Sequence, residues 1–221
     1  MGATTILVAR SRDKLFRISK ELHNSYGIPT DMSNPREIGT MINKVMRKYG
    51  TIDIVVNNAG VGYDSSIEEI NLNKLQYLFT LDFIGPLVAM QKVIPIMKKQ
   101  GGGSIINISS GTSLMSLPNM AAYSSIKRAM NGLSLTAHEE LQKYHINVSV
   151  IYPYITKTDF DKNMLRNTKM VQTHIDYEEN PGLRPPDNPE YIAQIVVEAI
   201  ESGKPELYAH EWMKHINISS L

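Results

Sequence analysis

The chain has 221 residues, 42% of them hydrophobic, which suits one globular α/β domain over residues 1–221. Its 23 basic and 22 acidic residues give a net charge of +1, so charge offers no case for binding nucleic acid or an anionic membrane surface. The absence of cysteine excludes disulfides and thiol catalysis. We expect no membrane span and no signal peptide, because no apolar run approaches roughly eighteen residues and the first ten residues lack a basic start. The predicted location is therefore the cytoplasm.

Hydrophobic periodicity predicts strands and helices that alternate along the chain, as in a parallel sheet covered by helices. The expected strands are 4–9, 52–56, 105–108, 146–151 and 206–208. The expected helices are one that follows Arg12 and ends near residue 24, then 34–49, one from about residue 67, then 75–99, 121–144 and 189–202. The six histidines show no paired ligand spacing with carboxylates, so we expect no catalytic metal.

The segment 103–127 has the clearest chemical pattern. An apolar strand ends in hydroxyl side chains, among them Ser110, at the edge of the sheet where open α/β folds place their ligand crevice. The helix that follows carries Tyr123 and Lys127 four positions apart, so both lie on one face. A tyrosine exchanges protons near neutral pH only if a close cation lowers its pKa, and Lys127 could be that cation. Taken alone, a Tyr-x-x-x-Lys spacing is more often an ordinary amphipathic pair.

Three features occur together in this sequence. Ile52–Gly60 reads Ile-Asp-Ile-Val-Val-Asn-Asn-Ala-Gly, the strand at 105–108 runs into Ser109 and Ser110, and Ser110 precedes Tyr123 by thirteen residues. In this order they resemble the classical short-chain dehydrogenase/reductase family, and the resemblance runs from about Thr4 to Tyr208. It implies a doubly wound, Rossmann-like, three-layer αβα fold. It also implies that Tyr123 is the general acid/base, that Lys127 lowers its pKa and binds the nicotinamide ribose, and that Ser110 holds the substrate oxygen.

The resemblance also implies which residues hold the cofactor. In the family, a basic residue just after the second strand accommodates the extra phosphate of NADP, and here that residue is Arg10, followed by Ser11 and Arg12. A guanidinium suits a phosphate monoester, so NADP is favoured over NAD, although Arg10 could simply be a solvated residue at a strand end. The other implied cofactor contacts are Asp31, Asn58, Ala59, Gly60, Tyr123, Lys127, Pro153, Ile155 and Thr158.

Four departures from the family pattern stand out. The family's first strand and glycine-rich turn have no counterpart before Thr4, which implies an N-terminally truncated sheet in which 4–9 loses a partner and 52–56 exposes an edge. The family's third strand also looks cut short, between residue 26 and Asp31. Asp82 replaces a usual asparagine and would hold the Lys127 ammonium more tightly, or could be an aspartate tolerated in a helix kink. Tyr154 replaces a glycine and would crowd the nicotinamide pocket or point outward.

The resulting prediction is an NADP-dependent oxidoreductase that interconverts a carbonyl and a secondary alcohol. A polar segment at about 157–185 is expected to cover the substrate, and the family implies a homodimer or homotetramer. One alternative is a non-catalytic relative or truncated fragment that acts as an interaction module without cofactor. A third alternative is an epimerase or dehydratase of the family's extended relatives, which shares the Tyr-x-x-x-Lys motif but usually has a larger C-terminal substrate domain than 221 residues allow.

Overall fold

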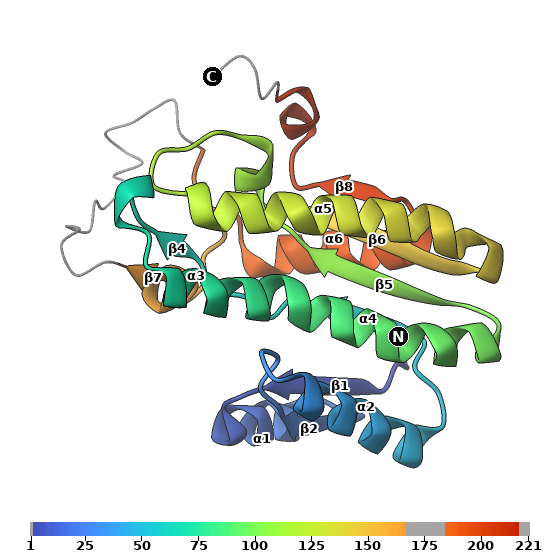
Figure 1. Cartoon of the computed structure of the whole chain (residues 1–221). Coiled ribbons are helices and arrows are strands. Elements are labelled where there is room, and N and C mark those ends of the chain that lie inside the picture. Colours follow the sequence, from blue (N-terminus) through green and yellow to red (C-terminus); the bar gives the residue numbers. More distant parts are fainter. Residues whose placement is uncertain (1, 167–183, 217–221) are drawn as a thin grey trace.

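The computed structural model describes residues 2–166 and 184–216 of the chain. All of its paired strands run parallel, and helices lie on both faces of the main sheet (Figure 1). The strands are β1 (Thr5–Ala9), β2 (Ser25–Pro29), β3 (Ile54–Asn57), β4 (Tyr63–Asp64), β5 (Gly103–Ile108), β6 (Ile146–Tyr152), β7 (Leu165–Arg166) and β8 (Glu206–Tyr208). The helices are α1 (Arg12–Glu21), α2 (Pro35–Tyr49), α3 (Leu72–Phe79), α4 (Gly85–Gln100), α5 (Ala121–Leu141) and α6 (Pro189–Ser202). The predicted α/β class is confirmed.

The sheet is divided into separate parts. One has four strands in the order β3-β5-β6-β8, a second consists of β1 and β2, and a small third pairs β4 with β7. Within the described residues, β1 pairs only with β2, and β3 only with β5. The predicted exposed edge at β3 is therefore present: the side chains of Ile54 and Val56 are 44% and 42% exposed.

The expectation that no full strand precedes Asp31 is wrong. Ser25–Pro29 forms a five-residue strand that pairs along its whole length with β1. Glycine and proline hide this strand in the sequence, since both are depleted in strands. The hydrogen bonds Thr5 N to Asn24 O and Thr30 N to Ala9 O show that alternate residues of β2 face β1, which turns the nitrogen of Pro29 to the outer edge. Proline is tolerated there because no ladder hydrogen bond is lost.

The two faces of the four-stranded sheet have separate cores. Ile105 of β5 packs with α2, α4 and α5, whereas the adjacent Ile106 packs with α6, because successive side chains of a strand point to opposite faces. Buried amides tie the first face together: Asn57 of β3 donates to Asn107 of β5, at 2.8 Å, and Asn107 donates to Ser134 of α5, at 2.9 Å. These bonds fix how β3 and β5 sit against α5.

The long helical stretch begins differently from the prediction. A 3₁₀ turn at Ile67–Glu69 precedes α3, and a π-helical turn at Thr80–Ile84 joins α3 to α4 without a break. Within the described residues, Leu72–Gln100 is long and apolar enough to cross a membrane by length and composition alone. Met90, Val93 and Met97 of this stretch lie in the buried core of the protein. The π-turn matters for the site because it carries Asp82.

Candidate active site

The three predicted catalytic residues come together where β5 ends and α5 begins. Ser110 follows β5 and caps the 3₁₀ turn Gly111–Leu114, its hydroxyl accepting from Thr112 N at 3.2 Å. Tyr123 and Lys127 lie one turn apart on the buried face of α5, and they are 4% and 6% exposed. The Lys127 ammonium lies 5.6 Å from the centroid of the Tyr123 ring, and Ser110 lies close enough to the Tyr123 hydroxyl to lower the pKa of that phenol. The predicted convergence is therefore present in the structure.

Asp82 forms a buried ion pair with Lys127. Its Oδ2 lies 3.0 Å from the Lys127 ammonium, and Asp82 itself is 1% exposed. Lys127 also donates to the backbone oxygen of Ile108, at 3.1 Å. Burial opposes the charged ammonium, but the nearby Asp82 carboxylate and Tyr123 raise the pKa of Lys127 overall. The ammonium therefore stays charged at neutral pH, held between the π-turn and the end of β5.

The Asn-Asn-Ala-Gly turn closes around the same carboxylate. Val61 N donates to Asp82 Oδ1 at 3.1 Å. A β-carbon at Gly60 would lie 2.7 Å from Asp82 Oδ2, closer than real β-carbon contacts, so only glycine allows this approach. Asp82 thus links the turn after β3 to α5: one carboxylate oxygen accepts from Val61 N and the other pairs with the Lys127 ammonium.

Tyr123 has a higher pKa than an ordinary tyrosine. Burial is the main cause of the raised pKa, because it disfavours the phenolate. The Asp82 carboxylate also raises the pKa of Tyr123, whereas Lys127 and Ser110 lower it. Lys127 acts on the pKa of Tyr123 in the expected direction, but burial outweighs this effect and the pKa is raised overall. A phenol in this environment holds its proton at neutral pH.

An apolar cover lies over the tyrosine. The ring of Phe160 packs against Tyr123 with centroids 5.9 Å apart, and Met164 lies against Gly62. Strand β7, which belongs to the predicted substrate-covering segment, pairs with β4, which follows β3. This pairing joins the two segments. Of that segment, residues 167–183 lie outside the described residues.

Five of the predicted cofactor residues line one cavity of about 470 Å³: Arg10, Asp31, Asn58, Ala59 and Gly60. Arg10 is exposed and donates to the Tyr77 hydroxyl at 3.1 Å. Hydrogen bonds from the Ser33 side chain and backbone, with a smaller contribution from Arg10, lower the pKa of Asp31. A carboxylate, a guanidinium and amide groups therefore meet at the carboxyl ends of β1, β2 and β3.

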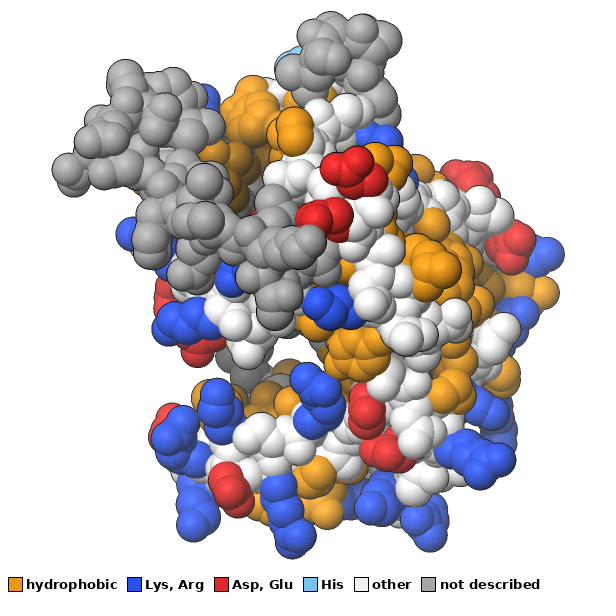
Figure 2. Space-filling view, turned by 60° about the vertical axis from the view of Figure 1, so that its left-hand side comes forward, with side chains coloured by type: hydrophobic (Ala, Val, Ile, Leu, Met, Phe, Trp, Pro, Cys, Tyr) orange, Lys and Arg blue, Asp and Glu red, His pale blue; other side chains and the backbone are white. Residues whose placement is uncertain are grey.

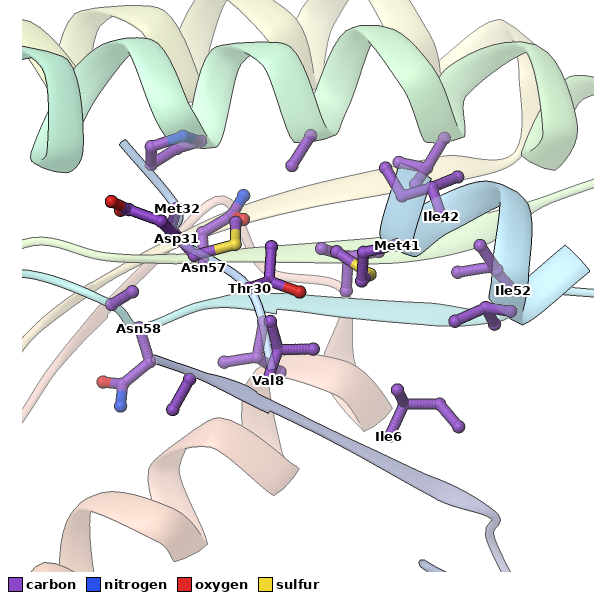
Figure 3. A pocket seen from close by; sticks show the side chains of 18 of the residues that line it. Ile6, Val8, Thr30, Asp31, Met32, Met41, Ile42, Ile52, Asn57 and Asn58 are labelled. Atoms are coloured by element: carbon purple, nitrogen blue, oxygen red, sulfur yellow. The ribbon is translucent and has the colours of Figure 1, made fainter. Parts of the chain in front are cut away.

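The other predicted cofactor residues do not line this cavity. Ser11 and Arg12 are exposed at the start of α1, where Arg12 lies over the ring of Phe16. Pro153, Ile155 and Thr158 lie beyond β6, and Thr158 accepts from Phe160 N at 3.2 Å. Of the predicted cofactor residues, the cavity therefore contains only some that were predicted to contact the adenosine end of the cofactor, together with Asn58, Ala59 and Gly60, and it does not include Ser11 or Arg12. Figure 2 shows the surface hollowed at the level of this cavity, and Figure 3 shows Asp31 and Asn58 among the residues that line it.

Tyr154 is partly buried and packs against the core cluster that contains Tyr152 and Met213. Its ring meets His210 and Trp212 edge-on at 5.7 and 5.8 Å between centroids, and its hydroxyl donates to Arg184 O at 3.3 Å. His210 in turn contacts the Asp187 carboxylate at 3.0 Å. Tyr154 therefore connects His210 and Trp212 near the C-terminus with Arg184, which lies near the end of the predicted substrate-covering segment.

Sequence reasoning missed several members of the site. The contacts of Val61 N and Ile108 O with Asp82 and Lys127 are made by backbone atoms, which leave no signal in side-chain identity. Phe160 could have been noted as the one phenylalanine of the polar segment 157–185, but its position over Tyr123 depends on tertiary packing. No group of three or more His, Cys, Asp or Glu suited to a metal occurs among residues 2–166 and 184–216.

Comparison with known proteins identifies the family. A sequence model described as short chain dehydrogenase matches residues 1–169. The uncharacterized oxidoreductase YxjF of Bacillus subtilis is 32% identical over 149 residues, which cover 67% of this chain and 58% of that protein.

Solved structures agree with this match. A short-chain dehydrogenase from Streptomyces avermitilis superposes with a TM-score of 0.83 at 26% identity, over 97% of this chain and 82% of that one. A metagenomic short-chain oxidoreductase in complex with NADP superposes with a TM-score of 0.66 at 29% identity, over 69% of this chain and 71% of that one. The chain belongs to the short-chain dehydrogenase family of nicotinamide-dependent oxidoreductases.

Proposed function

We propose that this protein is an NADP-dependent oxidoreductase that interconverts a carbonyl and a secondary alcohol. The observation that carries the proposal is the convergence of Ser110, Tyr123 and Lys127 at the end of β5, with Asp82 paired to the lysine. A hydroxyl at the end of β5, and a phenol and a buried ammonium one turn apart on α5, are the groups needed to hold a carbonyl oxygen and move its proton.

Each residue has one role in this proposal. Ser110 donates a hydrogen bond to the substrate oxygen, and Tyr123 gives that oxygen a proton during reduction or removes it during oxidation. Lys127 stabilises the phenolate that reduction leaves behind, and Asp82 holds the ammonium in place. When bound, the nicotinamide supplies or accepts the hydride at the carbonyl carbon. Burial keeps Tyr123 protonated, which favours its use as an acid in carbonyl reduction.

The residues that line the cavity suit the adenosine end of the cofactor. Arg10 offers a guanidinium for a phosphate monoester, and Asp31 and Asn58 offer acceptor and donor groups beside it. Lys127 and Tyr123 would contact the nicotinamide ribose, and Ile155 and Thr158 would lie near the nicotinamide end.

Two titrations and one kinetic variant test the proposal. Calorimetry should show tighter binding of NADPH than of NADH. Arg10→Ala should weaken NADPH binding about tenfold or more and leave NADH binding unchanged, since a charge-assisted hydrogen bond is worth roughly 1.5–3 kcal/mol. Arg17→Ala, which removes an exposed arginine of α1 outside the cavity, is the matched control. Equal losses for both cofactors would remove the argument for NADP.

Tyr123→Phe should abolish turnover of any carbonyl substrate that a screen identifies, while NADPH binding stays within about twofold. Retained turnover would refute the assigned acid. The alternative function, an interaction module without cofactor, is favoured by the unpaired edges of β1 and β3 and predicts that a folded sample binds neither nucleotide. Cytoplasmic location and assembly into a homodimer or homotetramer remain predictions from the sequence.

A further inference from the structure

Backbone hydrogen bonds hold the chain on both sides of Ser110. Beyond the end of β5, Ser109 N donates to Ile151 O of β6 at 2.8 Å, and Gly111 N donates to Pro153 O at 2.8 Å. These bonds continue the parallel pairing of β5 with β6 past the end of the strand. The backbone before and after Ser110 is therefore fixed against its neighbour.

A relay of side chains from α5 also fixes the carbonyl group of Ser110. Ser113 Oγ donates to Ser110 O at 2.6 Å, and Asn131 Nδ2 donates to Ser113 Oγ at 3.0 Å. Ser109 Oγ donates to Asn131 Oδ1, so the Asn131 amide joins a residue before Ser110 to a residue after it. The freedom that remains to Ser110 is the rotation of its side chain and of its hydroxyl proton.

Thr112 restricts both of these rotations. Its backbone N–H donates to Ser110 Oγ at 3.2 Å, and its side-chain hydroxyl donates to the same oxygen at 3.0 Å. A serine hydroxyl has two acceptor lone pairs and one proton. Because Thr112 uses both lone pairs, Ser110 Oγ can form a further hydrogen bond only as the donor.

A serine that can only donate suits one task at this site. Although burial raises the pKa of Tyr123 overall, Ser110 lowers it, as a donor to the phenolate would. Toward a substrate, such a serine can donate to a carbonyl or alcohol oxygen, but it cannot accept the proton of an alcohol. That proton is then left for Tyr123, which the reaction requires to take it.

We propose that Thr112 is a positioning residue, whose hydroxyl holds the Ser110 side chain in one rotamer and directs the Ser110 proton toward the substrate oxygen. The proposal rests on the proposed function, in which Ser110 holds that oxygen. Thr112 therefore acts through Ser110, and the loss of its hydroxyl should have no effect when the Ser110 hydroxyl is absent.

The first test measures the Ser110 rotamer by NMR in the full chain, without substrate or cofactor. In the parent chain, the three-bond couplings between the Ser110 Hα and Hβ protons should fit one staggered rotamer. In Thr112→Val, which keeps the shape of the side chain and the backbone N–H but lacks the hydroxyl, the couplings should average over more than one rotamer. Thr112→Ala should show the same averaging, whereas Thr112→Ser should keep the parent values. Thr136→Val, which changes an exposed threonine of α5, is the matched control.

The second test reports the direction of the Ser110 proton. With tyrosine labelled with ¹³C at Cζ, Thr112→Val should raise the pH at which the Tyr123 resonance titrates, because the phenolate loses an oriented donor. Ser110→Ala should raise it too, and adding Thr112→Val to Ser110→Ala should change nothing further. An unchanged or lower titration in Thr112→Val would overturn the proposal. A lower one would mean that Ser110 donates to Thr112 and turns toward Tyr123 only when the threonine hydroxyl is lost.

Neither test needs turnover, so the positioning role and the proposed function can fail separately. If Thr112→Val averages the Ser110 couplings while Tyr123→Phe retains turnover, the oxidoreductase assignment fails and the control of Ser110 by Thr112 stands. If Tyr123→Phe abolishes turnover but Thr112→Val leaves the Ser110 couplings unchanged, the assignment stands and Thr112 has no positioning role.

Discussion

Replacing Asp82 with asparagine probes the site most directly. The carboxylate uses Oδ1 for Val61 N and Oδ2 for the Lys127 ammonium, so asparagine keeps an acceptor for only one of these two donors, and it removes the negative charge. Two consequences follow. The ammonium loses its counter-ion, so the pKa of Lys127 should fall, and Tyr123 loses a neighbouring charge that raises its pKa.

The size of the effect on Tyr123 follows from the geometry. Asp82 Oδ2 lies 3.0 Å from the ammonium, and the ammonium lies 5.6 Å from the Tyr123 ring centroid, so the carboxylate is within about 9 Å of that ring. At that distance and an effective dielectric constant of about 20, the repulsion between carboxylate and phenolate is roughly 2 kcal/mol. Its removal should lower the pKa of Tyr123. Alcohol oxidation, which needs the phenolate, should then reach its plateau at a lower pH than in the parent chain.

The assay does not need a known substrate. Tyrosine labelled with ¹³C at Cζ reports each phenol by NMR, and Tyr123→Phe assigns the relevant resonance. In Asp82→Asn that resonance should titrate at lower pH than in the parent chain. An unchanged or higher pKa would refute the reasoning, because it would mean that the carboxylate does not act on the phenol. A matched Asp64→Asn variant should leave the Tyr123 titration unchanged.

Further predictions concern stability and can be checked by urea unfolding. Gly60→Ala should lower the free energy of unfolding by about 1–3 kcal/mol, because the added β-carbon would lie 2.7 Å from Asp82 Oδ2. Gly132→Ala, inside α5 and with no atom within 4 Å of the added carbon, should raise it by up to about 1 kcal/mol. Equal free energies of unfolding for the two variants would contradict the close packing at Gly60. Asn34→Ala should lower the free energy of unfolding by about 1 kcal/mol, because the Asn34 side chain caps α2 by accepting from Arg36 N and Glu37 N. If this loss is no larger than the loss from Asn73→Ala at an exposed site, the cap does not stabilise the protein. Asn107→Leu should cost roughly 2–4 kcal/mol, because it leaves Asn57 and Ser134 buried without their partner, and a nearly neutral change would show that this network contributes little.

Much of the fold could be read from local pattern. The β-branched runs at β1, β5 and β6 and the amphipathic α2 and α6 each match the period of the element they form, and their boundaries agree within a few residues. β2 could not be found this way. Its sequence, Ser-Tyr-Gly-Ile-Pro, has low strand propensity, and it becomes a strand because β1 supplies a hydrogen-bonding partner while its outer edge needs none.

The sequence by itself determined the family pattern, the order of the elements, and the placing of Ser110, Tyr123 and Lys127 at one end of the sheet, because these depend on spacing along a helix and on where a strand stops. Only the tertiary structure decided what those residues experience. Burial raised the pKa of Tyr123 that the Tyr-x-x-x-Lys spacing predicted to be lowered, and the π-turn brought Asp82 to 3.0 Å from Lys127. The reason is physical: periodicity sets which face a residue occupies, whereas desolvation and charge depend on segments far apart in the chain.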